Sequence, residues 1–211
     1  MGPASKILPA ARDLSGRDVD ILFCDDDNIY DRHWHKRIKQ AAVKKPNTCI
    51  VEMGYTFLDM NDADRPLDRL PRGRFRKRDL KYRLQRLAYL HLKKPNITTT
   101  GYVDMLAGYG GVLVRPEWFD ELAYDIPNIM WTVDDPWLSG NLERRGIPIW
   151  MTGKGYQLHD IGPGLVDSLT DFVSEEHDRS KANLLVVDYF RNNYGIWPKS
   201  EKVEINSPFG S

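Results

Sequence analysis

The sequence predicts an α/β fold in which one mixed sheet is flanked by helices. Short apolar runs alternate along the chain with segments whose apolar residues have helical spacing, and turns rich in Gly and Pro separate them. The length of 211 residues allows one domain with a sizeable core. A hydrophobic content of 41% with 28% charged residues is typical of a globular chain rather than a disordered one.

The first half of the chain predicts two strands and two helices. An apolar run at 19–24 predicts a buried strand, and helical spacing predicts a helix over 34–44. A second apolar run predicts a strand over 48–55, and the polar, Pro- and Arg-rich residues 59–78 predict a surface loop. Leucines and tyrosines at helical spacing predict a helix over 79–93.

The second half continues the alternation. A strand is expected over 102–107, followed by the glycine turn 108–111, with 112–114 continuing the strand. Pro116 opens a short helix that reaches residue 124. An acidic start, a basic end and Gly146 predict a helix over 134–145. Short strands at 147–151 and 156–158 and a helix over 181–191 complete the prediction.

The overall composition excludes several classes. Lys and Arg together number 30, as do Asp and Glu, so no net charge draws the chain onto nucleic acid. Cys24 and Cys49 are too few for a disulfide framework and are expected to be buried free thiols. No apolar run approaches the ~18 residues of a membrane span, and no signal-peptide pattern is present, so a cytoplasmic location is expected.

Three adjacent carboxylates, Asp25, Asp26 and Asp27, follow the first predicted strand. The carboxyl ends of strands are where open α/β sheets bind their ligands. Carboxylates this close repel one another unless a cation neutralises them. They could instead cap the next helix, but the cluster behind a buried strand favours a divalent metal that receives substrate phosphates.

Three later features belong with this cluster. Gly108 to Gly111 form a turn whose backbone can approach a ligand closely. Asp134 and Asp135 stand at a predicted helix N-terminus, which favours an ionised carboxylate fit to act as a base. His159 follows a short strand; a neutral imidazole is a common metal ligand, and the adjacent Asp160 could orient it by a hydrogen bond. Each feature alone is more often a turn, a helix cap or a structural histidine, and the ordered set carries the argument.

The ordered set resembles GT-A fold glycosyltransferases of the family-2-like kind. The sequence CDDDNIY at 24–30 resembles their acidic DxD motif, GYGGVL at 108–113 their glycine loop, and VDD at 133–135 their xED motif with Asp for Glu. His159 resembles their late metal-binding histidine, and GPASK at 2–6 a segment before the DxD strand of bacterial relatives. Such enzymes carry a βαβ nucleotide-binding half ahead of the DxD motif, and this chain has only a short lead there. The resemblance therefore implies a single GT-A-like domain over 1–211, with 171–211 as a helical extension, and two alternatives: either the domain is partial, or it holds the nucleotide differently.

The resemblance also implies a mechanism. Mn²⁺ or Mg²⁺ would be bound by Asp27, Asp25 and His159. Asp25 or Asp26 would meet the ribose of a UDP- or GDP-sugar or complete the metal shell. Lys6 could reach the diphosphate. Asp135 would be the general base for inverting transfer to an acceptor hydroxyl on a glycan or lipid-linked molecule.

The remaining assignments concern the donor site and the acceptor. Asp134 is grouped with the residues that bind the nucleotide-sugar. Gly110 and Gly111 would let the backbone approach a sugar. Trp137 could lie under the acceptor sugar, although a core tryptophan is the preferred interpretation.

Two other functions compete. A phosphohydrolase resembling the haloacid dehalogenase type would use Asp25 as nucleophile and Asp27 as general acid, with Asp134 and Asp135 as metal ligands. A non-catalytic module would bind a glycan or a partner without metal.

The basic stretch from Arg72 to Arg86 also has two interpretations. The preferred one is a solvated loop and helix face. The alternative is an anionic acceptor or peripheral contact with the inner membrane face.

Overall fold

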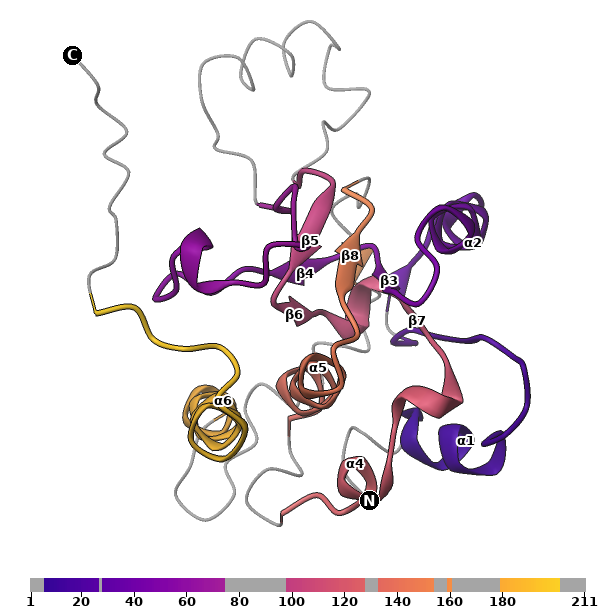
Figure 1. The fold of residues 1–211 in the computed structure, drawn as a ribbon. Coiled ribbons are helices and arrows are strands. Elements are labelled where there is room, and N and C mark those ends of the chain that lie inside the picture. The colour runs from indigo at the N-terminus through magenta and orange to yellow at the C-terminus, as the bar shows by residue number, and fades with distance from the viewer. Residues whose placement is uncertain are drawn as a thin grey trace, which may run out of the picture.

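The structure, a computed structural model, describes residues 6–26, 28–74, 98–127, 133–153, 159–160 and 179–201, with the backbone alone given for 159–160 and 179–181. It has the predicted α/β architecture, with a mixed sheet flanked by helices (Figure 1). The main sheet has five strands in the order β1 (Ile21–Phe23), β7 (Val112–Val114), β3 (Cys49–Val51), β8 (Ile149–Met151) and β5 (Gly101–Val103).

Strand direction decides which loops meet at each edge of the sheet. β3 and β8 are parallel, whereas β1–β7, β7–β3 and β8–β5 are antiparallel. β1, β3 and β8 therefore run one way, and β7 and β5 run the other. The carboxyl ends of the first three lie at the same edge as the loop that enters β7.

Two predicted strands are each divided between two sheets. The run 48–55 forms β3 and then β4 (Gly54–Tyr55), and the run 102–107 forms β5 and then β6 (Met105–Leu106). β4 and β6 pair with each other in a separate two-stranded sheet. The prediction of continuous strands was wrong here because each run turns out of the main sheet, at Glu52–Met53 and at Asp104. β7 does not continue β6 but returns to the main sheet between β1 and β3.

Alternating side chains divide the core into two layers. On one face, Ile50 and Leu113 pack with Ile38 of α2 (Trp34–Lys44), and Leu22 and Trp150 lie against the same cluster. The neighbouring strand residues point to the other face and join the larger cluster under the remaining helices. This is the period-2 alternation expected of a sheet that is covered on both sides. The bounds of α2 are those the sequence predicted.

The larger layer is built on α5 (Asp135–Arg144), which matches the predicted helix to within one residue at each end. Residues 136–142 of α5 are all buried, as expected of a helix surrounded by the core. α6 (Arg179–Tyr194) lies beside α5 (Figure 1), and a Cβ on Gly140 would overlap the Phe190 ring. The close approach of these two helices therefore requires glycine at position 140. α1 (Leu8–Asp13) and α4 (Glu121–Tyr124) cover the rest of this face, and α1 was not predicted.

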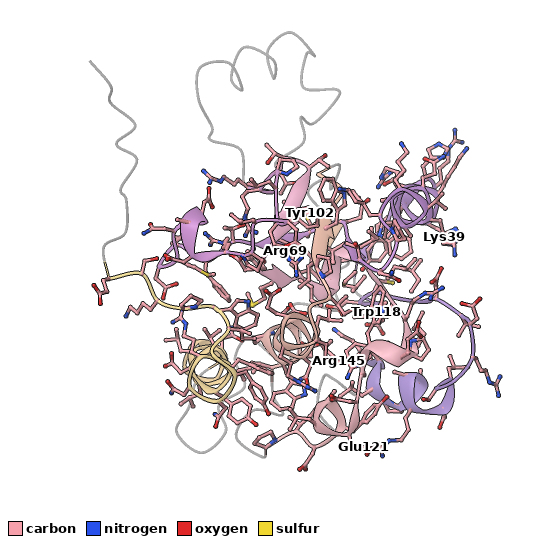
Figure 2. The ribbon with its side chains drawn as sticks, viewed as in Figure 1. Lys39, Arg69, Tyr102, Trp118, Glu121 and Arg145 are labelled. Carbon is pink, nitrogen blue, oxygen red and sulfur yellow. The ribbon has the colours of Figure 1, made fainter. Side chains whose placement is uncertain are left out.

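Short elements complete the described chain. They are β2 (Asn28–Ile29), β9 (His159–Asp160) and the 3₁₀ turns η2 (Asp62–Asp64), η3 (Gly108–Gly110) and η4 (Pro116–Trp118). The segment predicted as one short helix from Pro116 is η4 followed by α4. Figure 2 shows the side chains that fill the layers, with Tyr102 on β5 and Trp118 after β7. The predicted helix 79–93 and strand 156–158 lie outside the described residues. Within those residues, no helix is long and apolar enough to cross a membrane.

Candidate active site

The predicted site residues gather at one edge of the main sheet. Asp25 follows the carboxyl end of β1, and Glu52 and Thr152 follow the ends of β3 and β8. The glycine loop enters β7 at this same edge, and Asp134 precedes the first residue of α5 beside it. The carboxyl ends of strands are the usual ligand-binding edge of an α/β sheet.

Lys6 connects two of the predicted carboxylates. Its Nζ lies 2.8 Å from Oδ1 of Asp25 and 2.6 Å from Oδ2 of Asp134. The side chain of Asp134 is only 3% exposed, whereas those of Lys6 and Asp25 are 27% and 33% exposed. A buried carboxylate needs a nearby cation, and Lys6 supplies it from the segment before α1.

Asp135 is the first residue of α5, and its Oδ1 accepts a hydrogen bond of 2.9 Å from the Gly108 backbone N–H. Burial, and then the neighbouring charge of Asp134, raise the pKa of Asp135 to about 7. The hydrogen bond from Gly108 and the charge of Lys6 oppose this shift. The expectation that the helix N-terminus keeps this carboxylate fully ionised is therefore corrected. Near neutral pH it is divided between its two protonation states, which suits a group that exchanges protons.

The glycine loop meets this cluster through Gly108. A Cβ at this position would lie 2.9 Å from both Asp135 Oδ1 and Lys6 Nζ. At Gly110 and Gly111, the two glycines predicted to let the backbone approach a sugar, protein side chains fill the space that a Cβ would take. A Cβ on Gly110 would lie 2.7 Å from the Cβ of Met53. Gly111 has φ +95°, and a Cβ there would overlap the Trp34 indole. In the sequence, nothing distinguishes Gly108 from the other glycines of this loop.

Two aromatic residues join the loop to the end of β1. The Tyr30 hydroxyl lies 2.9 Å from the Asp25 carbonyl oxygen and 2.7 Å from that of Tyr109. Its single hydrogen can be donated to one of these at a time. The Tyr30 ring packs on Trp34 with centroids 4.8 Å apart, and Trp34 Nε1 donates a hydrogen bond of 2.9 Å to the Gly110 carbonyl. These contacts hold the loop backbone against the strand that carries the acidic cluster.

The late histidine lies beside the acidic cluster in the backbone. β2 pairs antiparallel with β9, in the register Ile29 opposite His159 and Asn28 opposite Asp160. β2 directly follows the acidic cluster. Its pairing with β9 therefore brings the backbone of His159 next to that cluster, although the two are far apart in sequence. Asp27 and the His159 side chain lie outside the described residues, and Asp26 is exposed. Among the described residues, no three His, Cys, Asp or Glu side chains are grouped as a metal site.

Glu52 is a buried acid at this edge that the sequence analysis did not identify. It is ion-paired with Arg37 of α2 at 2.9 Å and accepts a hydrogen bond of 2.9 Å from the Thr152 hydroxyl. Arg37 also pairs with Asp31 at 2.6 Å, and Glu52 N–H donates to the Gly111 carbonyl. Each charged group of this network has a partner, as expected of a structural network. The Glu52 N–H bonds it to the glycine loop at Gly111. Its signal in the sequence was a single acid inside an apolar run.

Two further assignments change. Trp137 is fully buried, donates from Nε1 to the Ala123 carbonyl and packs on Tyr189 and Phe190, so the preferred interpretation as a core residue is confirmed. It is not available beneath an acceptor sugar. Arg72 is also buried, with an ion pair to Asp104, and is not part of a solvated face as expected. Arg74 is 55% exposed, and the rest of that basic stretch lies outside the described residues.

Cys49 is a buried free thiol, as predicted, and Cys24 is a free thiol of intermediate exposure. Comparison with known proteins found no match to a family model, to a curated protein or to a solved structure.

Proposed function

We propose that this protein is a metal-dependent glycosyltransferase with a GT-A-like fold, which moves a sugar from a nucleotide-sugar donor to an acceptor hydroxyl with inversion. The observation that carries the proposal is the convergence of four motifs that are far apart in sequence. The DxD-like acids, the glycine loop, the Asp134–Asp135 pair and the backbone of His159 meet at the ligand-binding edge of the sheet.

The donor atoms fit a hard divalent cation. Asp25 and Asp134 share one positive charge, the Lys6 ammonium, whose Nζ lies 2.8 Å from Asp25 Oδ1 and 2.6 Å from Asp134 Oδ2. Carboxylate oxygens are the ligands that Mg²⁺ and Mn²⁺ prefer. In this proposal Asp25, Asp27 and His159 hold the cation, which when bound neutralises the donor diphosphate and makes the nucleotide a better leaving group.

The protein's own groups supply the remaining chemistry. Asp135, held by the Gly108 N–H, accepts the proton of the acceptor hydroxyl as that oxygen attacks the anomeric carbon. Lys6 binds the negative charge of the donor phosphates. Asp26, the exposed middle residue of the acidic run, would meet the ribose.

Calorimetric titration of UDP and GDP, with and without Mn²⁺, tests the donor site. We expect metal-dependent binding in the wild type that is lost in Asp25→Asn and Asp27→Ala. Asp20→Asn is the matched control. Asp20 lies before β1, whereas Asp25 lies after it, and Asp20 is ion-paired with Lys39 rather than with Lys6. Loss of binding in all variants alike would point to misfolding rather than to the site.

The base is tested by transfer assays over a panel of UDP- and GDP-sugars. Asp135→Asn should lower kcat by about 10²–10⁴-fold while leaving binding of the Mn²⁺–nucleotide pair intact. The phosphohydrolase would reveal itself by releasing phosphate from simple esters with Mg²⁺, without any nucleotide. Folded protein that binds neither metal nor nucleotide would indicate the non-catalytic module.

A further inference from the structure

The helix α2 carries a local excess of positive charge. The sequence has no Asp or Glu between Asp31 and Glu52, although Lys and Arg are balanced by Asp and Glu over the whole chain. The basic residues within this stretch are Arg32, Lys36, Arg37, Lys39, Lys44 and Lys45. α2 lies at the periphery of the molecule, on the opposite face of the sheet from α5 and α6 (Figure 1). The proposed function uses none of these cations.

Part of this charge is neutralised within the protein. Arg37 pairs with Asp31 and Glu52, and Lys39 pairs with Asp20. These acids come from other segments, because α2 itself contains none. The excess charge of α2 therefore belongs to its other basic residues.

Two of those residues lie on the outer side of the helix. Lys36, Gln40 and Lys44 follow one another at four-residue spacing, which places them on one face, opposite the buried Ile38. All three are exposed, and among the described residues neither lysine makes an ion pair. Val43 lies beside them and is 83% exposed. The outer face of α2 is thus a row of lysines with an aliphatic side chain among them.

The surface is hollowed at the C-terminal end of α2. A pocket of about 260 Å³ lies there, between the helix, the loop that follows it and the end of β7. Its charged rim and apolar floor include Asp20, Lys39, Lys45, Leu113, Arg115 and Trp118. Asp20 pairs with Lys39, and Arg115 is neutralised by the acids around it, whereas the Lys45 ammonium lies over the Trp150 ring, 4.1 Å from its centroid. Among the residues that line this recess, Lys45 therefore extends the excess charge of the outer face.

We propose that the outer face of α2 docks on the anionic surface of a phospholipid bilayer, with the helix parallel to the membrane plane. Lysine ammonium groups attract acidic lipid headgroups, and their flexible stems let them reach the headgroups while the helix stays on the protein. Val43 adds an aliphatic side chain at the level of the headgroups. The inner face of α2 remains in the core, so docking requires no unfolding.

Nucleic acid is the other polyanion that a basic face attracts. Proteins bind single strands by stacking the bases on aromatic rings, but the exposed apolar residue of this face is Val43. The aromatic residue of α2, Trp34, is half-buried and donates from Nε1 to the Gly110 carbonyl. A duplex is bound through its phosphates, and the chain has no net positive charge to hold it. The composition of the face therefore favours a bilayer.

Docking on α2 sets the direction in which the candidate site faces the membrane. Trp34 is the first residue of α2 and contacts the glycine loop, so a bilayer along α2 lies beside the ligand-binding edge of the sheet. The acceptor hydroxyl of a lipid-linked molecule would then reach Asp135 from the membrane. This link to the acceptor rests on the proposed function, whereas the docking of α2 does not.

Co-sedimentation with vesicles tests the docking. The vesicles are phosphatidylcholine alone or with about one-third phosphatidylglycerol, which supplies the negative surface potential. Wild type should bind the anionic vesicles at low salt and be released at about 0.5 M NaCl. The double variant Lys36→Glu, Lys44→Glu should bind at least about tenfold more weakly, because each basic residue near an anionic surface contributes roughly fivefold. Arg17→Glu, Lys199→Glu is the matched control, since it makes the same change in net charge at exposed residues outside α2.

Each outcome decides for or against the docking. Loss confined to the α2 double variant supports it. No binding of anionic vesicles by folded wild type, or equal weakening in both double variants, overturns it. Tighter binding to a DNA duplex than to vesicles at the same salt, lost in the α2 variant alone, would assign the face to nucleic acid instead. Circular dichroism confirms that each variant is folded. The assay contains neither nucleotide nor metal, so its failure leaves the proposed transferase untouched, and a failed nucleotide titration leaves the docking untouched.

Discussion

Two charge clusters in this molecule have an excess of opposite sign. Cations are in excess around Asp104, and carboxylates are in excess at the candidate site. Around Asp104, Arg65 donates to both carboxylate oxygens, Arg72 pairs with the same group, and the Phe57 N–H adds a further hydrogen bond. At the candidate site, Asp25 and Asp134 pair with the Lys6 ammonium, and Asp135 lies beside them; among the described residues these acids outnumber the cations that contact them.

The difference lies in how far each carboxylate is satisfied. The acceptors of Asp104 are saturated, and Arg65 also donates to the Met60 and Phe57 carbonyls, so this cluster ties the 56–74 loop to the sheet. Arg69, labelled near Tyr102 in Figure 2, pairs with Asp68. Saturation is typical of a structural network, whereas an under-neutralised acidic cluster at a ligand-binding edge is typical of a functional one.

Removing the carboxylate of the saturated cluster should have the largest effect. Asp104→Ala leaves Arg65 and Arg72 as buried charges without their anion, and we expect a loss of about 3–5 kcal/mol in the free energy of unfolding. Asp62→Ala, which removes a 46% exposed partner of Arg65, should cost less than about 1 kcal/mol. Urea denaturation measures both. Similar losses in the two variants would remove the distinction between the buried pair and its surface neighbour.

The glycine loop offers a second, smaller test. Gly111→Ala must accommodate φ +95° and displace the Trp34 indole, and we expect a loss of about 2–4 kcal/mol. Gly146→Ala also has a positive φ, +71°, but no atom lies within 4 Å of the added Cβ, so it should lose only about 1 kcal/mol. Comparing the two by urea denaturation separates packing against Trp34 from backbone conformation. Equal losses would show that Trp34 moves aside freely.

The stability of the folded protein should depend on pH through the ionisation of Asp135. The pKa of Asp135 is about 7 in the folded protein, above its value of about 4 in an unfolded chain. The folded state therefore binds more protons between these values, and the contribution of Asp135 to stability falls as pH rises from about 4 to 7. Asp135→Asn cannot ionise and can still accept from Gly108. It should leave Tm unchanged at pH 4 and raise it by about 3–8 °C at pH 8.

Calorimetric melts from pH 4 to 8 follow this difference. Asp120→Asn is the opposite control, because Arg144 holds the pKa of Asp120 low, at about 2, so this variant should be destabilised across the range. A wild-type curve parallel to that of Asp135→Asn would place the ionisation of Asp135 outside this window.

The sequence predicted the helices better than the strands, for a local reason. α2 and α5 carry their boundaries in nearby residues: apolar spacing for both, and for α5 an acidic first turn, a basic last turn and Gly146. The runs 48–55 and 102–107 were each predicted as one continuous strand. An apolar run predicts a strand, but it does not indicate which other strand that strand pairs with. Their breaks fall at Glu52 and Asp104, whose ion pairs reach Arg37 and the arginines of the 56–74 loop.

The same limit applies to the candidate site. Asp25, Asp134 and Asp135 could be selected from their motifs, and the structure brings them together. The contacts made by Lys6 could not be predicted, because its partners are 19 and 128 positions away and nothing local indicates them. Gly108 was hidden among equivalent glycines, and only its contact distances to Asp135 and Lys6 distinguish it.

The buried helix α5 has a consequence for how this protein can vary. The proposed base is its first residue, the Ser139 hydroxyl joins the Asp135 carbonyl to the Leu106 N–H, and Gly140 lies under Phe190 of α6. The packing of two helices thus fixes the backbone of Asp135, and the Gly108 N–H of the glycine loop holds its side chain. Substitutions in surrounding loops other than the glycine loop can change what is bound without moving the proposed base. Substitutions between α5 and α6, although remote from any ligand, should change the rate instead, so a screen for altered specificity and a screen for altered turnover would recover different parts of this chain.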